Sequence, residues 1–214
     1  MFSPRLILSL RLSKSHLPGA LCLLAWACLV GVGMGFLMRY EQRPGSQPAS
    51  PELWPTKFSA ELDRTRANLV VFAHPRCPCT RATVTELEQI VRRCGNRVRV
   101  VVYFYEPASA DADWTEAPLW KQARAIPGVE VRADIDGTAA QIFSAETSGQ
   151  SLLFAKNGQR LFAGGITGGR GHQGENAGEN AVIAAILGAE STAKNTSVFG
   201  CSLTGTAPRT AASL

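Results

Sequence analysis

Residues 17–38 contain no charged side chain. A helix needs about 20 apolar residues to cross the hydrocarbon core of a membrane, and it pairs every backbone polar group within itself. We therefore expect one N-terminal transmembrane helix, in which Cys22 and Cys28 serve as small apolar side chains. A cleaved signal peptide is an alternative, although its apolar region is shorter, at about 7–15 residues, and ends at a small-residue cleavage site. A cytoplasmic apolar helix is a third interpretation.

The charges around this run predict its orientation. Arg5, Arg11 and Lys14 precede it, whereas the charges of residues 39–43 nearly cancel. By the positive-inside rule, residues 1–16 lie in the cytoplasm and the rest lies across the membrane. We expect a single-pass protein of the inner membrane with its C-terminal domain on the periplasmic, extracytoplasmic face. A cleaved signal would export the same domain, and thiols can be oxidised there.

The remaining chain has the composition of a folded domain with little excess charge. The net charge is +5, of which three charges precede the apolar run. No clustered basic face with aromatic side chains is evident, so we expect no nucleic-acid partner. Prolines at four of residues 41–55 indicate an extended linker. The predicted segments are a cytoplasmic N-terminus (1–16), a transmembrane anchor (17–38), a linker (39–57), a folded domain (58–190) and an irregular tail (191–214).

Hydrophobic periodicity predicts an α/β domain. Strands are expected at 68–73, 97–105, 129–133, 151–155 and 160–164. Helices are expected at 58–66, 79–94, 118–126, 138–143 and 180–187. Asn157-Gly158 between two apolar runs predicts a hairpin. Strands that alternate with helices and then end in a hairpin indicate a mixed sheet with helices on both faces, which is a three-layer sandwich.

The motif His74-Pro-Arg-Cys77-Pro-Cys79 lies where a predicted strand ends and a helix begins. The free N–H groups at a helix start stabilise a thiolate, so Cys77 is the expected nucleophile. Arg76 adds positive charge nearby, and His74 adds more or accepts a proton. Pro78 is tolerated because a first-turn proline lacks an N–H that has no helical partner.

Three interpretations of Cys77 and Cys79 remain open. A disulfide across one residue closes a small, strained ring, and strained disulfides are the labile, catalytic ones. The pair would then be redox active. Thiolates also prefer Cu(I), with His74 or His172 available to complete a metal site. A purely structural pair is the third interpretation.

Three segments carry a resemblance to a known group. Residues 72–82, 164–172 and 198–201 resemble bacterial membrane-anchored thioredoxin-like proteins of the RedB type. The resemblance implies a thioredoxin-like fold, a thiol–disulfide oxidoreductase activity on protein thiols or disulfides, and no cofactor. Two departures keep a copper-binding chaperone or assembly factor open. One residue separates the cysteines instead of two, and residues 148–151 lack the proline that thioredoxins place opposite the motif.

Three further side chains are candidate auxiliary or structural residues. His172 lies in a loop with seven glycines in residues 164–178. It either folds over Cys77 as a base or ligand, or stays exposed. Cys94 lies one helix length from the motif, about 22 Å away, and is expected to be a buried apolar side chain. Cys201 in the tail is either a third redox thiol or a partner for Cys94.

Overall fold

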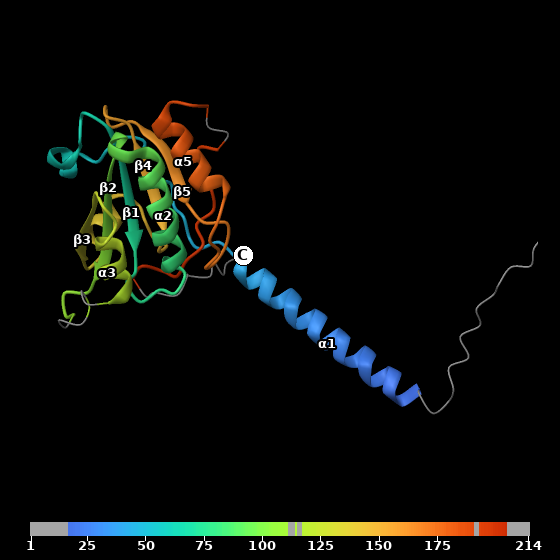
Figure 1. Ribbon diagram of the computed structural model, residues 1–214. Coiled ribbons are helices and arrows are strands. Elements are labelled where there is room, and N and C mark those ends of the chain that lie inside the picture. Colours follow the sequence, from blue (N-terminus) through green and yellow to red (C-terminus); the bar gives the residue numbers. More distant parts are fainter. Residues whose placement is uncertain (1–16, 111–113, 115–116, 191–192, 205–214) are drawn as a thin grey trace, which may run out of the picture. The chain divides into compact units, whose positions relative to one another are not determined.

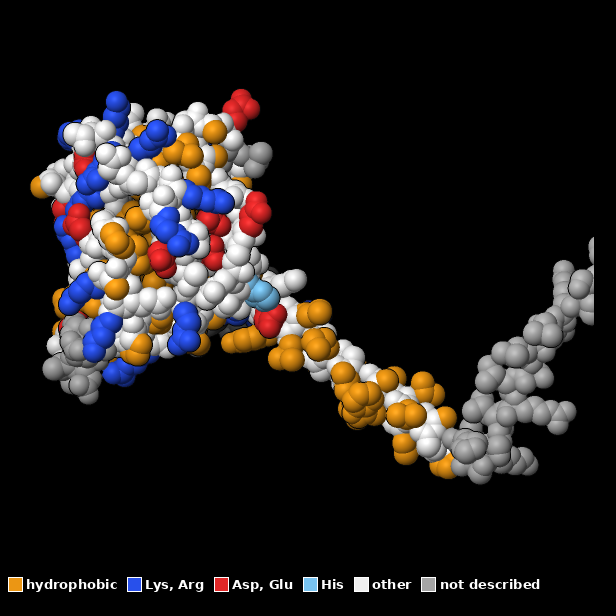
Figure 2. Space-filling view, viewed as in Figure 1, with side chains coloured by type: hydrophobic (Ala, Val, Ile, Leu, Met, Phe, Trp, Pro, Cys, Tyr) orange, Lys and Arg blue, Asp and Glu red, His pale blue; other side chains and the backbone are white. Residues whose placement is uncertain are grey.

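The computed structural model describes residues 17–110, 114, 117–190 and 193–204. The predicted cytoplasmic segment, residues 1–16, lies outside the described residues. The chain divides into two compact units, Met1–Tyr40 and Glu41–Leu214. The first contains helix α1 (Leu17–Glu41; Figure 1), whose large apolar side chains are exposed (Figure 2).

Helix α1 is long and apolar enough to cross a membrane. Pro18 lies in its first turn, where the missing N–H costs no helical hydrogen bond. A signal sequence near an N-terminus passes the same test of length and composition. The helix is therefore a candidate membrane anchor or signal.

The second unit is built on one five-stranded sheet with the strand order β3-β2-β1-β4-β5. Strands β1, β2 and β3 are parallel, whereas β4 is antiparallel to both β1 and β5. The elements are η1 (Thr56–Glu61), β1 (Ala67–Ala73), α2 (Thr80–Cys94), η2 (Gly95–Arg97), β2 (Val98–Glu106), α3 (Pro118–Arg124), β3 (Val129–Ile135), α4 (Thr138–Ile142), β4 (Gln150–Phe154), β5 (Arg160–Gly165) and α5 (Ala177–Leu187).

Both faces of the sheet are covered, because side chains of successive strand residues point to opposite faces. In β1, Leu69 and Val71 face α2, α3 and α5, and helix α2 contributes Leu87 to this core. Val70 and Phe72 face the opposite side, toward α4 and the segment around η1. Figure 1 shows α2 and α5 over the same face of the sheet. The three-layer prediction is confirmed.

Parallel β1-α2-β2-α3-β3 followed by an antiparallel hairpin and a last helix is a thioredoxin-like fold. The hairpin of β4 and β5 turns where Asn157-Gly158 predicts it. Gly158 has a φ of +86°, a conformation that glycine adopts without strain. The Asn157 side chain accepts a hydrogen bond from the N–H of Gln159 at 3.0 Å.

The predicted helix at 58–66 is wrong in type and length. The structure has a 3₁₀ helix that ends at Glu61. The Asp63 carboxylate accepts hydrogen bonds from the N–H and hydroxyl of Thr65, at 2.8 and 2.6 Å. The Asn68 side chain accepts from the N–H of Asp63 at 2.9 Å. These side-chain hydrogen bonds replace helical ones and turn the chain into β1.

The described part of the tail, residues 193–204, is held against the domain without forming a regular helix or strand. The N–H of Ala163 in β5 donates to the carbonyl of Lys194 at 3.0 Å, and Thr196 donates back to Ala163 at 3.3 Å. Val198 and Leu203 are buried. The tail therefore passes beside β5 and continues to the loop that precedes β4.

Candidate active site

The turn between β1 and α2 positions the two motif cysteines. The N–H of Cys77 donates to the carbonyl of His74 at 3.1 Å, and the N–H of Thr80 donates to the carbonyl of Cys77 at 3.1 Å. Helix α2 then begins at Thr80, directly after Cys79. Cys77 is 3% exposed and Cys79 is half-buried. Cys77 thus precedes a helix start, as the sequence predicts.

Several hydrogen bonds stabilise the thiolate form of Cys77. Burial is the largest single influence and opposes ionisation. Hydrogen bonds from the side chain and backbone of Cys201, and then from the side chain and backbone of Thr80, together outweigh it. The pKa of Cys77 therefore lies below its ordinary value, because donors to a charged group favour that charged form.

Ser148, in the loop that precedes β4, is hydrogen-bonded to the turn that carries the motif. The hydroxyl of Ser148 accepts from the N–H of His74 at 2.8 Å and lies 2.7 Å from the hydroxyl of Thr80. The N–H of Gly149 donates to the carbonyl of Phe72 at 2.7 Å. A hydroxyl network thus joins the end of β1, the start of α2 and the loop that leads into β4.

The tail brings a third cysteine to this loop. The N–H of Ser148 donates to the carbonyl of Cys201 at 2.8 Å, and a bridge pairs Thr147 with Ser202 in the antiparallel sense. This pairing places Cys201 beside the motif, where its side chain and backbone lower the pKa of Cys77. Three cysteines from two distant parts of the chain therefore share one site. All described cysteines are free thiols.

Arg170 supplies positive charge to this cluster. It donates a hydrogen bond to the carbonyl of Gly200 at 2.7 Å. Burial and then the nearby Cys77 raise the pKa of Cys79, and Arg170 partly offsets this rise. Burial and then Cys77 raise the pKa of Cys201 to about 12, again with Arg170 opposing. Of the three thiols, Cys77 is the one whose ionised form the site favours.

The rings of His74, Tyr105 and Trp114 form an aromatic rim beside the motif, and Arg76 lies over it. The His74 ring lies 5.8 Å from that of Tyr105 and 5.6 Å from that of Trp114. The Arg76 guanidinium lies 4.3 Å from the centre of the Trp114 ring. Burial, followed by the charge of Arg76, lowers the pKa of His74, whose Nδ1 accepts from the N–H of Arg76 at 3.1 Å. The site therefore disfavours the protonated form of His74, and one ring nitrogen is occupied by a hydrogen bond.

His172 and Cys94 lie away from the motif's hydrogen bonds. The Nε2 of His172 lies 3.1 Å from a carboxylate oxygen of Glu41, and both side chains are exposed. Cys94 is buried in the core at the far end of α2, as expected for an apolar side chain. From the glycine-rich loop it is Arg170, and not His172, whose charge acts on the cysteines.

The copper alternative named Cys77, Cys79 and His74 as ligands. Among the described residues, no three or more His, Cys, Asp or Glu side chains form a group that could hold a metal ion. Nothing in this part of the chain favours copper binding over thiol chemistry.

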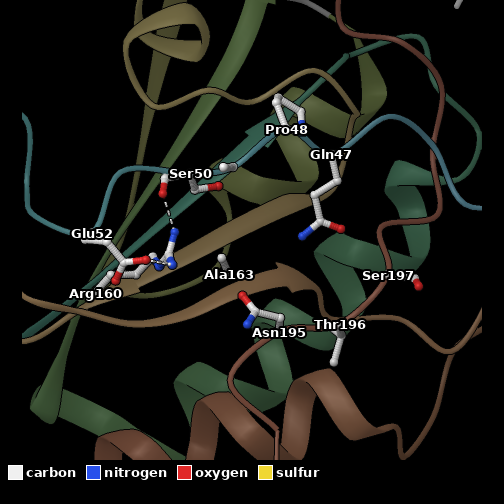
Figure 3. Close-up of a pocket in the computed structure, with 10 residues that line it drawn as sticks. Gln47, Pro48, Ser50, Glu52, Arg160, Ala163, Asn195, Thr196 and Ser197 are labelled. Atoms are coloured by element: carbon white, nitrogen blue, oxygen red, sulfur yellow. Dashed lines mark hydrogen bonds and ion pairs between the residues drawn. The ribbon is translucent and has the colours of Figure 1, made fainter. Parts of the chain in front are cut away.

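A pocket of about 490 Å³ opens elsewhere on the domain, between the linker, β5 and the tail (Figure 3). Arg160 lines it beside Ser50 and Glu52, and its guanidinium donates to the Ser50 carbonyl and, at 2.5 Å, to the Glu52 carboxylate. Its lining residues are Gln47, Pro48, Ala49, Ser50, Glu52, Arg160, Ala163, Asn195, Thr196 and Ser197. They include no thiol, so we assign no chemistry to this pocket.

Comparisons with known proteins agree with the fold. No family model matches the sequence, and no curated protein matches it. A hypothetical protein from Sinorhizobium meliloti is 20% identical with a TM-score of 0.56, over 77% of this chain and 96% of its own. An uncharacterized conserved protein from Geobacillus kaustophilus is 16% identical with a TM-score of 0.56, over 75% of this chain and 91% of its own.

An exposed lipoprotein thioredoxin from Streptococcus pneumoniae is 12% identical with a TM-score of 0.44, over 65% of this chain and 99% of its own. At these identities the first two likenesses concern the fold alone. The strand order and the site together define this chain as a thioredoxin-like domain with a cluster of three cysteines.

Proposed function

We propose that this chain is a membrane-anchored, exported thiol–disulfide oxidoreductase of the RedB type in which Cys77 is the nucleophile. The observation that carries the proposal is the position of Cys77 in the turn directly before α2, within a thioredoxin-like fold, where the pKa of its thiol is lowered. The thiolate is the form that attacks a disulfide, and the site favours ionisation at Cys77 over Cys79.

The exchange proceeds in two balanced steps. The Cys77 thiolate attacks one sulfur of a partner disulfide, which forms a mixed disulfide and releases the other partner sulfur as a thiolate that takes a proton. Cys79 then loses its proton and attacks the Cys77 sulfur. The Cys77–Cys79 disulfide forms, and the second partner sulfur leaves. The partner is reduced and the motif is oxidised; the reverse sequence oxidises a partner dithiol.

The partner is expected to be a protein thiol or disulfide and to dock on the aromatic rim of His74, Tyr105 and Trp114. Rings at a surface bind an extended segment through apolar area, at little cost in side-chain entropy. Arg76 over Trp114 adds a positive edge to this rim.

Export through α1 supports this chemistry, because a disulfide persists outside the cytoplasm. We place α1 in the inner membrane with the domain on the extracytoplasmic face. A phosphatase reporter fused after α5 should be active only in the exported compartment; a cytoplasmic reporter signal would exclude this placement. Mass spectrometry of the purified chain separates an intact anchor from a cleaved signal.

The activity is tested with the full chain in detergent, carrying alanine at Cys22 and Cys28 to remove unrelated thiols. In glutathione redox buffer the chain should cycle between dithiol and disulfide. Cys77→Ser should abolish cycling, whereas the matched control Cys94→Ala, which changes a buried thiol of the core, should not. Equal cycling by the Cys77→Ser variant would refute the proposal. Stoichiometric Cu(I) binding without cycling would favour the copper alternative.

A further inference from the structure

The end of the described tail pairs in the antiparallel sense with the loop that precedes β4. The N–H of Ser148 donates to the carbonyl of Cys201 at 2.8 Å, and the N–H of Leu203 donates to the carbonyl of Glu146 at 2.9 Å. A bridge joins Thr147 and Ser202 between them. This pairing fixes the register of the tail and holds Cys201 beside Ser148, whose hydroxyl is hydrogen-bonded to His74 and Thr80 of the motif turn.

Close packing holds the tail in this place. A Cβ on Gly200 would lie 1.9 Å from the carbonyl oxygen of Ser148, so only glycine permits this approach. Arg170 donates to the Gly200 carbonyl from the other side at 2.7 Å. Leu203 is 1% exposed in the core beyond the bridge. Contacts of Gly200 and of Leu203, which flank Cys201 in the sequence, therefore hold Cys201 at the site.

The exposure of the thiols differs in a way that matters for exchange. Cys77 is 3% exposed, whereas Cys201, which the tail pairing holds beside the motif, is exposed. We propose that Cys201 is a third redox thiol, which accepts the Cys77 sulfur from the Cys77–Cys79 disulfide and carries the oxidised bond to the surface. This inference rests on the proposed function and adds one step to it, the attack of Cys201 on the Cys77–Cys79 disulfide.

The step is an internal exchange that consumes no oxidant. Cys201 loses a proton, and its thiolate attacks the Cys77 sulfur. The Cys77–Cys201 bond forms while the Cys77–Cys79 bond breaks, and Cys79 leaves as a thiolate that takes up the proton. Strain in the ring closed by one residue drives the exchange. An incoming partner thiolate can then attack at Cys201.

Oxidation of Cys77 itself prepares Cys201 for this attack. In the reduced site, burial and then the hydrogen bond and charge of Cys77 raise the pKa of Cys201. Once Cys77 is in a disulfide it carries no charge, so it no longer raises the pKa of Cys201 by charge repulsion. Arg170 remains beside Cys201 and favours its thiolate.

The test is a disulfide map of the full chain, with alanine at Cys22 and Cys28, oxidised by excess oxidised glutathione. After alkylation and digestion, we expect the peptide that contains Cys77 and Cys79 to be joined to the peptide that contains Cys201. Cys201→Ser should leave only the Cys77–Cys79 bond, and Cys94→Ala should leave the map unchanged.

A second readout uses turnover. Cys79→Ser should still release bound glutathione, because Cys201 can attack Cys77, and a stable mixed disulfide should accumulate only when Cys79 and Cys201 are both serine. A chain that cycles but yields only the Cys77–Cys79 bond overturns this inference and leaves the proposed function intact. A chain that does not cycle at all overturns both.

Discussion

Replacing Gly200 by alanine tests whether the tail closes the site. The added Cβ would lie 1.9 Å from the Ser148 carbonyl oxygen, whereas a carbon and an oxygen normally approach to about 3.3–3.6 Å. The tail must move by about 1.5 Å or detach. Overpacking of this kind costs about 1–3 kcal/mol, which lowers the ratio of docked to undocked tail roughly 5- to 150-fold.

The assay is the rate of Cys77 alkylation by iodoacetamide as a function of pH, with the label located by mass spectrometry. At high pH, where Cys77 is fully ionised, the Gly200→Ala rate should rise by up to this factor, because an undocked tail exposes Cys77. Gly168→Ala is the matched control, because its Cβ would meet only an ordinary 3.7 Å contact. Identical profiles for the two variants would refute the docked tail.

Three further substitutions, at Thr80, Arg170 and Glu179, test the electrostatics of the domain. Thr80→Ala should raise the pKa of Cys77, because a hydrogen bond to its thiolate is lost, and Thr80→Ser should not; alkylation midpoints measure both. Arg170→Gln should slow disulfide exchange more than Arg170→Lys, which keeps the positive charge that lowers the pKa of Cys79; quenched-flow trapping measures the rates. Burial and then Glu86 raise the pKa of Glu179, so its contribution to stability is lost as pH rises through the folded-state value. Glu179→Gln should therefore raise the free energy of unfolding near neutral pH, with no gain in acid, as denaturant melts at several pH values would show.

The fold could be predicted from local patterns. The apolar runs and the amphipathic spacing of α2 report which face each element buries, and the hairpin turn at Asn157-Gly158 is a local signal. Helix α5 begins earlier than predicted because Asn176 caps it by accepting from the N–H of Glu179 at 2.9 Å. That signal was present in the sequence as an Asn followed three residues later by a Glu.

The position of the Cys77-Pro78-Cys79 motif between a strand end and a helix start could also be predicted, because both signals are adjacent in the sequence. The place of Cys201 could not be predicted, because it depends on the close packing of Gly200 on Ser148, between residues far apart in the chain. The absence of a proline at Ser148 was visible in the sequence. The hydrogen bond between the hydroxyls of Ser148 and Thr80 could not be predicted from the sequence.

The glycine-rich loop shows the same limit. Arg170 and His172 are two residues apart, and nothing in the sequence indicates which of them faces the cysteines. The backbone of Arg170 is fixed by its N–H, which donates to the carbonyl of Glu41 at 3.1 Å, while the His172 side chain pairs with the Glu41 carboxylate at the surface. Side-chain direction in a loop follows from such long-range contacts.

The central claim is that Cys77 is the stabilised thiolate of this site. The most direct measurement is a pH titration of thiolate ultraviolet absorbance on the reduced full chain, with alanine at Cys22 and Cys28. One thiol should ionise below the ordinary cysteine value of about 8.5. Its step should disappear in Cys77→Ser and persist in Cys79→Ser. A titration with every step at or above the ordinary value, or a low step that survives Cys77→Ser, would contradict the account.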